Sequence, residues 1–394
     1  MTDTVVIGAG QAGLCASWFL TRHGREHVVL EAARVGESWR RRWDGFWLNT
    51  PNWTVALPGR PYSGDDPDGF MRRDETVRHL EEYAAGFDAP VREGVRVDRL
   101  ADGYLLETSA GGLEARNVVV ATGAFNRAHL PRLDAPLPQL HSDDYRSPSE
   151  LPEGPVLVVG SGQSGCQIAD ELLQAGRRVY LAVGRCPWLP RRHRGKDVLH
   201  WMVAIGLMDE TADKLPSPQA RLACNPALSG NEGGYDCNPL TLSRQGAVLV
   251  GRVEGVEGGR LRFGADVPEN LAKGREFAAQ IVGRIDAHLK AHGSDAPPSD
   301  LSAELPDPPG EPVRELDVSE LGSIVWASGY RPDYGWIELP LFDELGWPVH
   351  ERGVTAAPGL YFVGVHWLWK RKSALFLGVG EDAEHVVEHL VANR

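Results

Sequence analysis

The sequence contains no Cys-x-x-Cys pair, because its five cysteines lie far apart, at Cys15, Cys166, Cys186, Cys224 and Cys237. This spacing supports neither a metal cage nor a redox dithiol. No apolar run approaches the roughly 18 residues that a membrane-spanning helix needs. Basic residues are fewer than acidic ones, and the net charge of -13 argues against binding nucleic acid or an anionic membrane surface.

The length of 394 residues exceeds what one hydrophobic core usually serves, so we expect two domains. The chain shows no signal-peptide pattern: an apolar strand follows Met1, Thr2 and Asp3 without a basic start or a cleavage site. We therefore expect a cytoplasmic protein. The sequence leaves the oligomeric state open, a homodimer included.

A glycine-rich turn follows the first apolar strand. Gly8 permits a tight turn, Gly10 lets the backbone approach a pyrophosphate, and Gly13 lets the next helix pack closely on the strand. The N-terminus of that helix offers free N–H groups to phosphates. A second strand, 27–30, ends on Glu31, about 20 residues later, where a carboxylate can accept hydrogen bonds from ribose hydroxyls. The pattern predicts an FAD site; the alternative is a glycine turn without a ligand.

The same pattern recurs in the middle of the chain, with Gly160, Gly162 and Gly165 before a helical stretch. Its second strand ends differently, because no acid follows and Arg185 stands directly after Gly184. A carboxylate there would repel a 2′-phosphate, whereas a guanidinium pairs with it in bidentate fashion. We therefore expect NADPH rather than NADH. Other nearby basic residues either add to this preference or form a solvated loop: Arg191, Arg192, Arg194 and Lys196.

Two turns of this kind predict an α/β fold with two Rossmann-like dinucleotide-binding domains, an FAD domain with an inserted NADPH domain. We place the first part of the FAD domain at 1–147, the NADPH domain at 148–320, and the second part of the FAD domain at 321–394. Residues 200–246, rich in Gly, Pro and Asn towards their end, are expected to form a lid-like loop over the active site.

Three further segments are expected beside the cofactors. Two apolar strands end in similar small-small-Gly turns, 121–123 and 327–329, which either carry the chain past bound cofactor or are ordinary strand ends. Near the end of the chain, 378–382 leads into a final helix, 383–391. The N-terminus of that helix could face the flavin, where the reduced form carries negative charge, and this places Glu381 at the site.

These features together resemble the flavin-containing monooxygenase family, the class B flavoprotein monooxygenases that include YUCCA-type and Baeyer–Villiger enzymes. The resemblance spans nearly the whole chain. Besides both glycine turns it rests on 36–39, similar to the family's Gly-Gly-x-Trp, and on 326–330, similar to its Phe/Leu-Ala-Thr-Gly-Tyr. The family's identifying motif is half present: 141–145 matches its second half, and Ala135 and Leu137 stand where Phe and Gly would be.

The resemblance also implies an active-site amide. Residues 48–53 are similar to the family's Asn-x-x-Lys stretch, with Asn49 on the family's active-site Asn, which lies beside the flavin near the site of oxygen attachment. Asn52 stands where the family has Lys. We therefore predict Asn49 and Asn52 as catalytic residues. Without the resemblance, both would be interpreted as turn residues near proline.

The predicted cofactor residues fall into two sets, and no metal site is predicted. The FAD set is Gly8, Gly10, Gln11, Ala12, Gly13, Glu31, Ser38, Trp39, Val97, Ala121, Thr122, Gly123 and Glu381. The NADPH set is Gly160, Gly162, Gln163, Ser164, Gly165, Arg185, Arg192, Ser328 and Gly329.

The resemblance implies a reaction. NADPH reduces FAD, dioxygen adds to the reduced flavin as a C4a-(hydro)peroxide in a pocket that excludes water, and one oxygen atom passes to a small organic substrate. N-oxygenation, S-oxygenation and Baeyer–Villiger oxygenation all stay open. So do three other activities: a reductase that passes electrons to a protein or quinone, an oxidase that makes hydrogen peroxide, and a flavoprotein sensor without catalysis.

Replacing Arg185 by Ala tests the predicted choice of nucleotide. The Arg185→Ala variant should lose affinity for NADPH by roughly ten-fold or more, because one charge-assisted contact with the 2′-phosphate is removed. Its affinity for NADH, which lacks that phosphate, should change little. Anaerobic titrations of the flavoprotein with each nucleotide measure both affinities. An equal loss for NADPH and NADH would contradict the role of Arg185.

Overall fold

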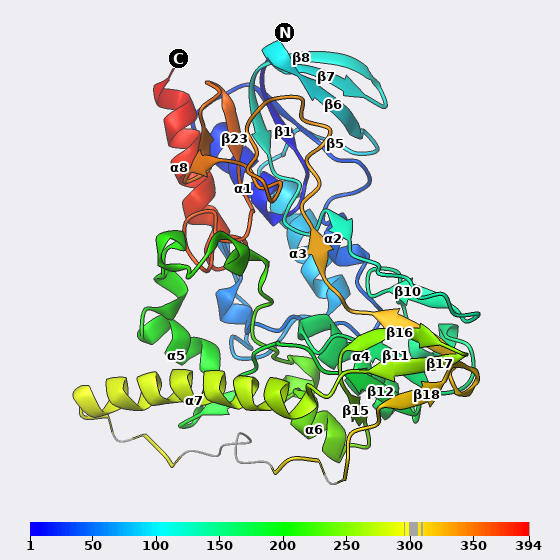
Figure 1. The fold of residues 1–394 in the computed structure, drawn as a ribbon. Coiled ribbons are helices and arrows are strands. Elements are labelled where there is room, and N and C mark those ends of the chain that lie inside the picture. The colour runs from blue at the N-terminus through cyan, green and yellow to red at the C-terminus, as the bar shows by residue number, and fades with distance from the viewer. Residues whose placement is uncertain (295, 299–305, 309, 394) are drawn as a thin grey trace.

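The computed structural model describes residues 1–294, 296–298, 306–308 and 310–393. The chain forms two α/β halves, each built around a set of parallel strands, and one half lies above the other in Figure 1. Both ends of the chain lie at the far end of the first half, away from the second.

The sheet of the first half contains nine strands. Its centre is β1 (Thr2–Ile7), which pairs in parallel with β2 (His27–Leu30) on one side and β8 (Gly111–Val120) on the other. Val5 and Val6 of β1 are fully buried, as expected for an apolar strand with neighbours on both sides. The other strands are β5 (Val91–Arg92), β6 (Val97–Ala101), β7 (Leu105–Thr108), β21 (His350–Glu351), β22 (Val354–Thr355) and β23 (Leu360–Phe362).

Two helices from opposite ends of the chain pack against each other beside this sheet (Figure 1). α1 (Gln11–Arg22) follows the first glycine turn, and α8 (Val379–Ala392) is the last element. Leu14 of α1 and Val387 of α8 are fully buried in one hydrophobic cluster. The first half is therefore built from both ends of the chain.

The sheet of the second half has five parallel strands in the order β10-β19-β11-β12-β15. The neighbouring strands β10 and β19 come from residues on either side of the expected 148–320 segment, so the sheet includes residues beyond both ends of that segment. The five strands are β10 (Gln139–His141), β11 (Val156–Val159), β12 (Val179–Ala182), β15 (Val248–Val250) and β19 (Ser323–Trp326).

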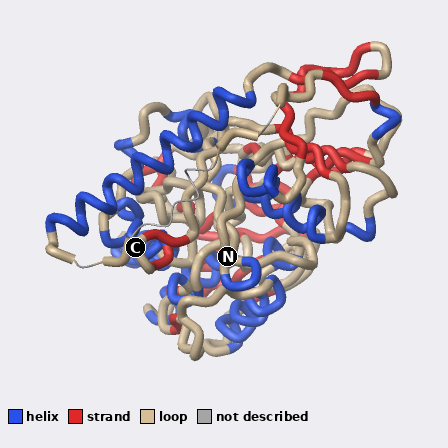
Figure 2. The backbone as a smooth tube through the Cα atoms, turned by 90° about the horizontal axis from the view of Figure 1, so that it is seen from below, coloured by secondary structure: helices blue, strands red, loops and turns tan. Residues whose placement is uncertain are grey.

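Helices and a small sheet surround the second half, and in Figure 2 the strands lie mostly inside and the helices mostly outside. α4 (Gln163–Gln174) follows the second glycine turn. α7 (Val267–Ala291), the longest helix in Figure 1, buries Ile285 and Leu289. The small antiparallel sheet contains β16 (Val253–Glu257), β17 (Arg260–Phe263) and β18 (Glu315–Asp317).

The segment expected as a lid-like loop, 200–246, is a series of short helices. It contains most of α5 (Val198–Ala204), all of α6 (Pro239–Arg244) and four 3₁₀ turns between them. α6 is capped by the Asn238 side chain, which accepts hydrogen bonds from the N–H groups of Leu240 and Thr241. The Asn and Pro residues of this segment therefore begin helices as well as turns.

The remaining short elements connect these parts. They are α2 (Glu37–Arg40), α3 (Arg73–Ala85), β3 (Ala56–Leu57), β4 (Arg60–Pro61), β9 (Arg127–Ala128), β13 (Arg192–His193), β14 (Lys196–Asp197) and β20 (Tyr330–Arg331).

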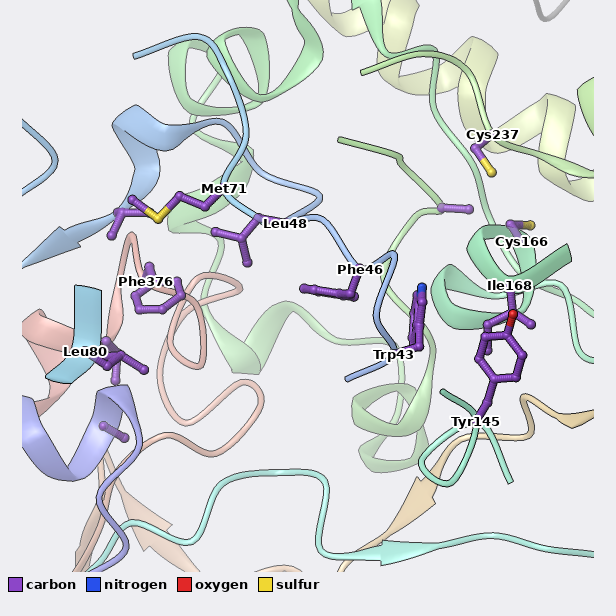
Figure 3. Packing of buried hydrophobic residues seen from close by; sticks show 14 of the residues in the cluster. Trp43, Phe46, Leu48, Met71, Leu80, Tyr145, Cys166, Ile168, Cys237 and Phe376 are labelled. Atoms are coloured by element: carbon purple, nitrogen blue, oxygen red, sulfur yellow. The ribbon is translucent and has the colours of Figure 1, made fainter. Parts of the chain in front are cut away.

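Buried aromatic side chains join the two halves along α4. Figure 3 shows Trp43 and Tyr145 beside Ile168, which lies on α4. Trp43 is 2% exposed and Tyr145 is fully buried. The Tyr145 hydroxyl donates a hydrogen bond to Oε2 of Glu171, one turn further along α4, at 2.9 Å. An acidic side chain is thus held in a mainly apolar contact between the halves.

Burial raises the pKa of Glu171 to about 7, despite the hydrogen bond from Tyr145 that lowers it. Between its ordinary pKa and pH 7 the folded protein therefore holds a proton that the unfolded chain releases. The contribution of Glu171 to the free energy of unfolding is full below the ordinary pKa and falls as the pH rises towards 7 and beyond.

In the Glu171→Gln variant, the side chain at position 171 is neutral at every pH. It should melt at the same temperature as the wild type at pH 5 and several degrees higher at pH 8, because only the wild type then holds a buried negative charge. Thermal denaturation at the two pH values measures the difference, with Glu150→Gln, an exposed carboxylate, as the control. A melting temperature that is shifted equally at both pH values would refute the assignment.

Candidate functional site

The first glycine turn has the geometry that a bound dinucleotide needs. Gly8 has φ +105°, and a Cβ on it would lie 2.7 Å from the carbonyl oxygen of Ala121. A Cβ on Gly13 would overlap the carbonyl oxygen of Gly8. Gly10 differs, because no heavy atom of the described residues lies within 4 Å of the place of its Cβ, apart from its chain neighbours. Gly8 and Gly13 are thus required by the fold, whereas Gly10 leaves room for a ligand.

The second turn repeats this backbone closely. Gly160 has φ +109°, and its Cβ would lie 2.5 Å from the carbonyl oxygen of Ala327. A Cβ on Gly165 would overlap the carbonyl oxygen of Gly160. The glycines that precede the two helices also match, with φ −81° and ψ −174° at Gly10 and φ −75° and ψ −171° at Gly162. The two patterns predicted from sequence therefore form the same structure.

The residues that distinguish the two sites lie at corresponding strand ends. Glu31 follows β2, and its carboxylate accepts from the N–H of Ala9 at 2.8 Å and from the N–H of Ala33 at 3.0 Å. Arg185 follows β12 and is exposed. It lies close enough to Glu269 to lower the pKa of that carboxyl, after the larger effects of Lys273. An anionic group therefore stands at the first turn and a cationic group beyond the second.

Gln11 links the two ends of the chain at the first site. Its Nε2 donates to the carbonyl oxygen of Ala374 at 3.1 Å, and its Oε1 accepts from Nε1 of Trp39 at 2.8 Å. The Trp39 ring in turn stacks on Phe376, with ring centres 5.4 Å apart. Of the two residues predicted from the 36–39 motif, Trp39 thus lies at the turn, and Ser38 is exposed beside it.

The strand-end turns predicted to lie beside the cofactors touch the glycine turns through their backbones. The N–H of Ala121 donates to Ile7 at 2.9 Å, and the N–H of Ala327 donates to Val159 at 2.9 Å. The neighbouring predicted residues are Thr122, Gly123, Ser328 and Gly329. Val97, by contrast, lies on β6 in the outer hairpin, two residues beyond Val95, whose N–H donates to the carbonyl oxygen of Glu31 at 2.9 Å.

Arg191 is the most connected buried charge at the junction of the halves. Only 1% of it is exposed, and its Nη2 donates to Oδ1 of Asp197 at 2.6 Å. Its Nη1 donates to the carbonyl oxygens of Asn49 at 2.8 Å and Ser229 at 3.4 Å. Burial lowers the pKa of Arg191, and the Asp197 carboxylate opposes that shift. This guanidinium therefore holds the Asn49 segment against the second half.

The other basic residues after Arg185 also have protein partners. Arg192 donates to the carbonyl oxygens of Gly233 and Gly234, each at 2.7 Å. Arg194 pairs with Asp286 at 3.0 Å. Arg192 was predicted as an NADPH residue, and in the structure its guanidinium binds the 233–234 loop.

The two predicted catalytic asparagines have different surroundings. Asn49 is half-buried at the junction, and Arg191 fixes its backbone. Asn52 is 5% exposed, and its Nδ2 donates to the carbonyl oxygen of Asp66 at 2.9 Å. The Asn52 side chain therefore anchors the neighbouring 66–69 loop.

Basic residues near the C-terminus form ion pairs with the lid segment. Lys370 and Lys372 both pair with Glu381 and with Asp209, each at 3.0 Å from Asp209. Arg371 pairs with Glu210 at 3.2 Å. The carboxylate of Glu381, predicted at the flavin, is thus held by two lysines at the start of α8.

A cavity of about 130 Å³ lies between α4, the 43–47 segment and the 229–231 segment. Its lining combines the rings of Trp43 and Trp47 with polar groups of α4, among them Gln167 and Asp170. Asp170 is 2% exposed, and burial raises the pKa of its carboxyl. Residues 45 and 47 of its lining lie close to Asn49 along the chain, and its buried acceptor atoms include Oε1 of Gln167 and Oδ1 of Asp170.

One pair of cysteines that are distant in the sequence is joined in the structure. Cys186 and Cys224 form a disulfide, although they are 38 residues apart in sequence. Cys15, Cys166 and Cys237 are free and buried, and burial raises the pKa of each thiol.

Within the described residues, no group of three or more His, Cys, Asp and Glu side chains could hold a metal ion. The same part of the chain contains no helix that is both long and apolar enough to cross a membrane.

Comparison with known proteins identifies the family. A family model described as pyridine nucleotide-disulphide oxidoreductase matches residues 5–204. An uncharacterized CzcO-like oxidoreductase from Geobacillus kaustophilus is 31% identical over 99% of each chain. Indole-3-pyruvate monooxygenase YUCCA1 from Oryza sativa is 27% identical and covers 73% of this chain and 76% of its own. A solved flavin-containing monooxygenase from Stenotrophomonas maltophilia has a TM-score of 0.60 at 22% identity, covering 99% of this chain and 98% of its own.

These similarities confirm the predicted fold class, α/β with two Rossmann-like domains, and the predicted resemblance to flavin-containing monooxygenases. With its two equivalent glycine turns, this chain belongs to the pyridine nucleotide-disulphide oxidoreductase family, among relatives that include flavin monooxygenases, and it is an oxidoreductase.

Proposed function

We propose that this chain is an NADPH-dependent FAD monooxygenase that transfers one atom of dioxygen to a small organic substrate. The observation that carries the proposal is the pair of superimposable glycine turns with opposite charges at their strand ends, Glu31 at one and Arg185 at the other. The YUCCA-type and flavin-containing monooxygenases among its relatives support the same cofactors and reaction.

The residues at the first turn fit FAD. A side chain on Gly10 would fill the space before the N-terminus of α1, so glycine keeps this space for a pyrophosphate. Glu31 lies at the turn, where its carboxylate can accept hydrogen bonds from ribose hydroxyls in place of the one from the Ala9 N–H. Gln11 and Trp39 connect this turn to the last part of the chain, so that both ends of the chain contribute to one site.

The residues at the second turn fit NADPH. Gly160 and Gly165 repeat the backbone of the first turn, and the N-terminus of α4 presents its free N–H groups in the same way. Arg185, exposed beyond β12, can reach a 2′-phosphate in place of the ribose acid of the first site.

At the junction between the two halves, the chain positions the reacting groups and excludes water. When bound, FAD supplies the redox chemistry: it takes a hydride from NADPH and uses dioxygen to oxygenate the substrate. Arg191 holds the backbone of Asn49 in place, so that the Asn49 amide can donate a hydrogen bond where oxygen reacts. Trp43, Phe46 and Leu48 are buried nearby and exclude water from this region.

The cavity beside Trp47 is the substrate site we favour. Its acceptor groups, Asp170 among them, suit a substrate that donates hydrogen bonds, such as an amine, better than a carboxylate. Amines of a size that fits about 130 Å³ are therefore the first compounds to test.

The experiment reduces the purified flavoprotein with NADPH without air and then admits oxygen. We expect a transient near-ultraviolet flavin band before oxidised flavin returns, because the site shelters the reacting oxygen. In Asn49→Ala the band should decay about ten-fold faster or more, the effect of one lost hydrogen bond of about 1.4 kcal/mol, while reduction by NADPH is nearly unchanged. Asn393→Ala, at the end of the chain, serves as the control and should match the wild type.

Two results would count against the proposal. Immediate reoxidation with one hydrogen peroxide formed per NADPH and no transient band would identify an oxidase. Slow reoxidation by oxygen together with rapid oxidation by a quinone or an electron-accepting protein would identify a reductase.

A further inference from the structure

We propose that Cys186 and Cys224 form a redox-active pair that controls NADPH binding: the disulfide blocks the second glycine turn, and its reduction to two thiols opens it. The inference rests on the proposed NADPH site at Gly160, Gly162 and Gly165. It adds a modification site to that function, and small thiols and disulfides are the reagents it takes.

The two glycine turns differ at the place that the disulfide blocks. In four backbone features the turns are alike: the first and third glycines make equivalent close approaches, and the middle glycines have nearly equal φ and ψ. They differ at the space in front of the middle glycine. Beside Gly10, no heavy atom of the described residues other than its chain neighbours lies within 4 Å of the Cβ position. Beside Gly162, the Cys186 Sγ lies at 3.3 Å, the Cys224 Cβ at 3.7 Å and the Cys224 Sγ at 3.9 Å.

The disulfide therefore occupies the side of the turn from which a pyrophosphate approaches. The middle glycine of such a turn lacks a side chain so that phosphate can contact its backbone. A sulfur atom in van der Waals contact with the Cβ position takes that place instead. Phosphate and disulfide cannot occupy the same volume, so NADPH and the closed disulfide exclude each other.

The segment that carries Cys224 is held unevenly. On its C-terminal side, the N–H of Ala227 donates to Pro187 at 2.9 Å, and the N–H of Leu228 donates to Oε1 of Gln163 at 3.0 Å. On its N-terminal side, the 3₁₀ turn Pro218–Leu222 buries no residue, and Cys224 itself is exposed. Breaking the disulfide thus frees the Cys224 end to move, while the Ala227 end stays attached.

The positions of the two sulfurs favour reduction by a small dithiol. Its thiolate can attack Cys224 Sγ, on the exposed residue, which breaks the S–S bond and releases the Cys186 thiolate beside the N-terminus of α4. The positive end of a helix dipole stabilises such a thiolate as it leaves. The second thiol of the reagent then displaces Cys224 from the mixed disulfide. The protein gains two electrons and two protons, and the reagent becomes a cyclic disulfide.

The test compares NADP⁺ binding and flavin reduction in the two redox states of the FAD-loaded full chain. One sample is oxidised with glutathione disulfide and the other reduced with dithiothreitol, and both are freed of reagent without air. Alkylation followed by mass spectrometry shows whether the Cys186 and Cys224 peptides are joined. We expect the reduced form to bind NADP⁺ at least ten-fold more tightly and to reach half-maximal flavin reduction at correspondingly lower NADPH.

Matched variants separate this effect from general thiol chemistry. Cys224→Ser, at an exposed position, should bind NADP⁺ like the reduced wild type in both treatments, and Cys186→Ser should do the same. Cys237→Ala removes a free thiol of the same segment and should respond to the two reagents as the wild type does.

Equal NADP⁺ affinity of the oxidised and reduced wild type would overturn the inference and leave the proposed function standing. So would alkylation of both cysteines after oxidation, because no pair would then form. If neither redox state, nor Cys224→Ser, bound NADP⁺ or was reduced by NADPH, the proposed NADPH site itself would fail.

Discussion

The arrangement of this protein depends on a backbone contact that only glycine allows. In each half, the third glycine of the turn brings the first turn of a helix against the carbonyl oxygen of the first glycine. Any side chain at Gly13 or Gly165 would push the helix away from its sheet. Because that contact fixes the helix N-terminus at the edge of the parallel strands, it creates the same anion-binding position twice.

A small number of polar contacts across the apolar junction join the two anion-binding positions into one site. Arg191 is the chief of these, since it joins Asp197 and Ser229 of the second half to Asn49 of the first. A buried guanidinium is costly unless its partners are in place, so this contact favours one relative position of the segments over others. The lysines that bind Glu381 and Asp209 act in a similar way nearer the surface. Figure 3 shows apolar side chains at the junction between the two halves, from Phe376 to Ile168.

Short sequence patterns predicted the parts of the structure that depend on residues close together in the chain. The glycine turns, the strands beside them and the residues Glu31 and Arg185 depend on short spacings that the sequence displays directly. A helix follows each glycine turn as predicted, α1 after the first turn and α4 after the second. The alternation of apolar strand, glycine turn and helix is enough to indicate the α/β fold, because few folds use it.

Contacts between distant segments were missed, for a physical reason. Arg191 is one of several arginines in a row, and only the fold decides that it is buried while Arg192 binds a loop. Cys186 and Cys224 meet because the lid segment turns back over α4, which no cysteine spacing reveals. Asn52 matched a family position, yet its amide holds a neighbouring loop. In each case the long-range fold decides the partner of a polar side chain.

The central claim is that the two equivalent turns hold different cofactors, FAD at the first and NADPH at the second. The most direct measurement compares Gly10→Val with Gly162→Val, both purified with dithiothreitol, for flavin content and for anaerobic reduction by NADPH. We expect that Gly10→Val is purified without FAD, whereas Gly162→Val retains FAD that NADPH no longer reduces although dithionite does. A Gly162→Val protein that NADPH reduces as readily as the wild type, or a Gly10→Val protein with full FAD content, would contradict it.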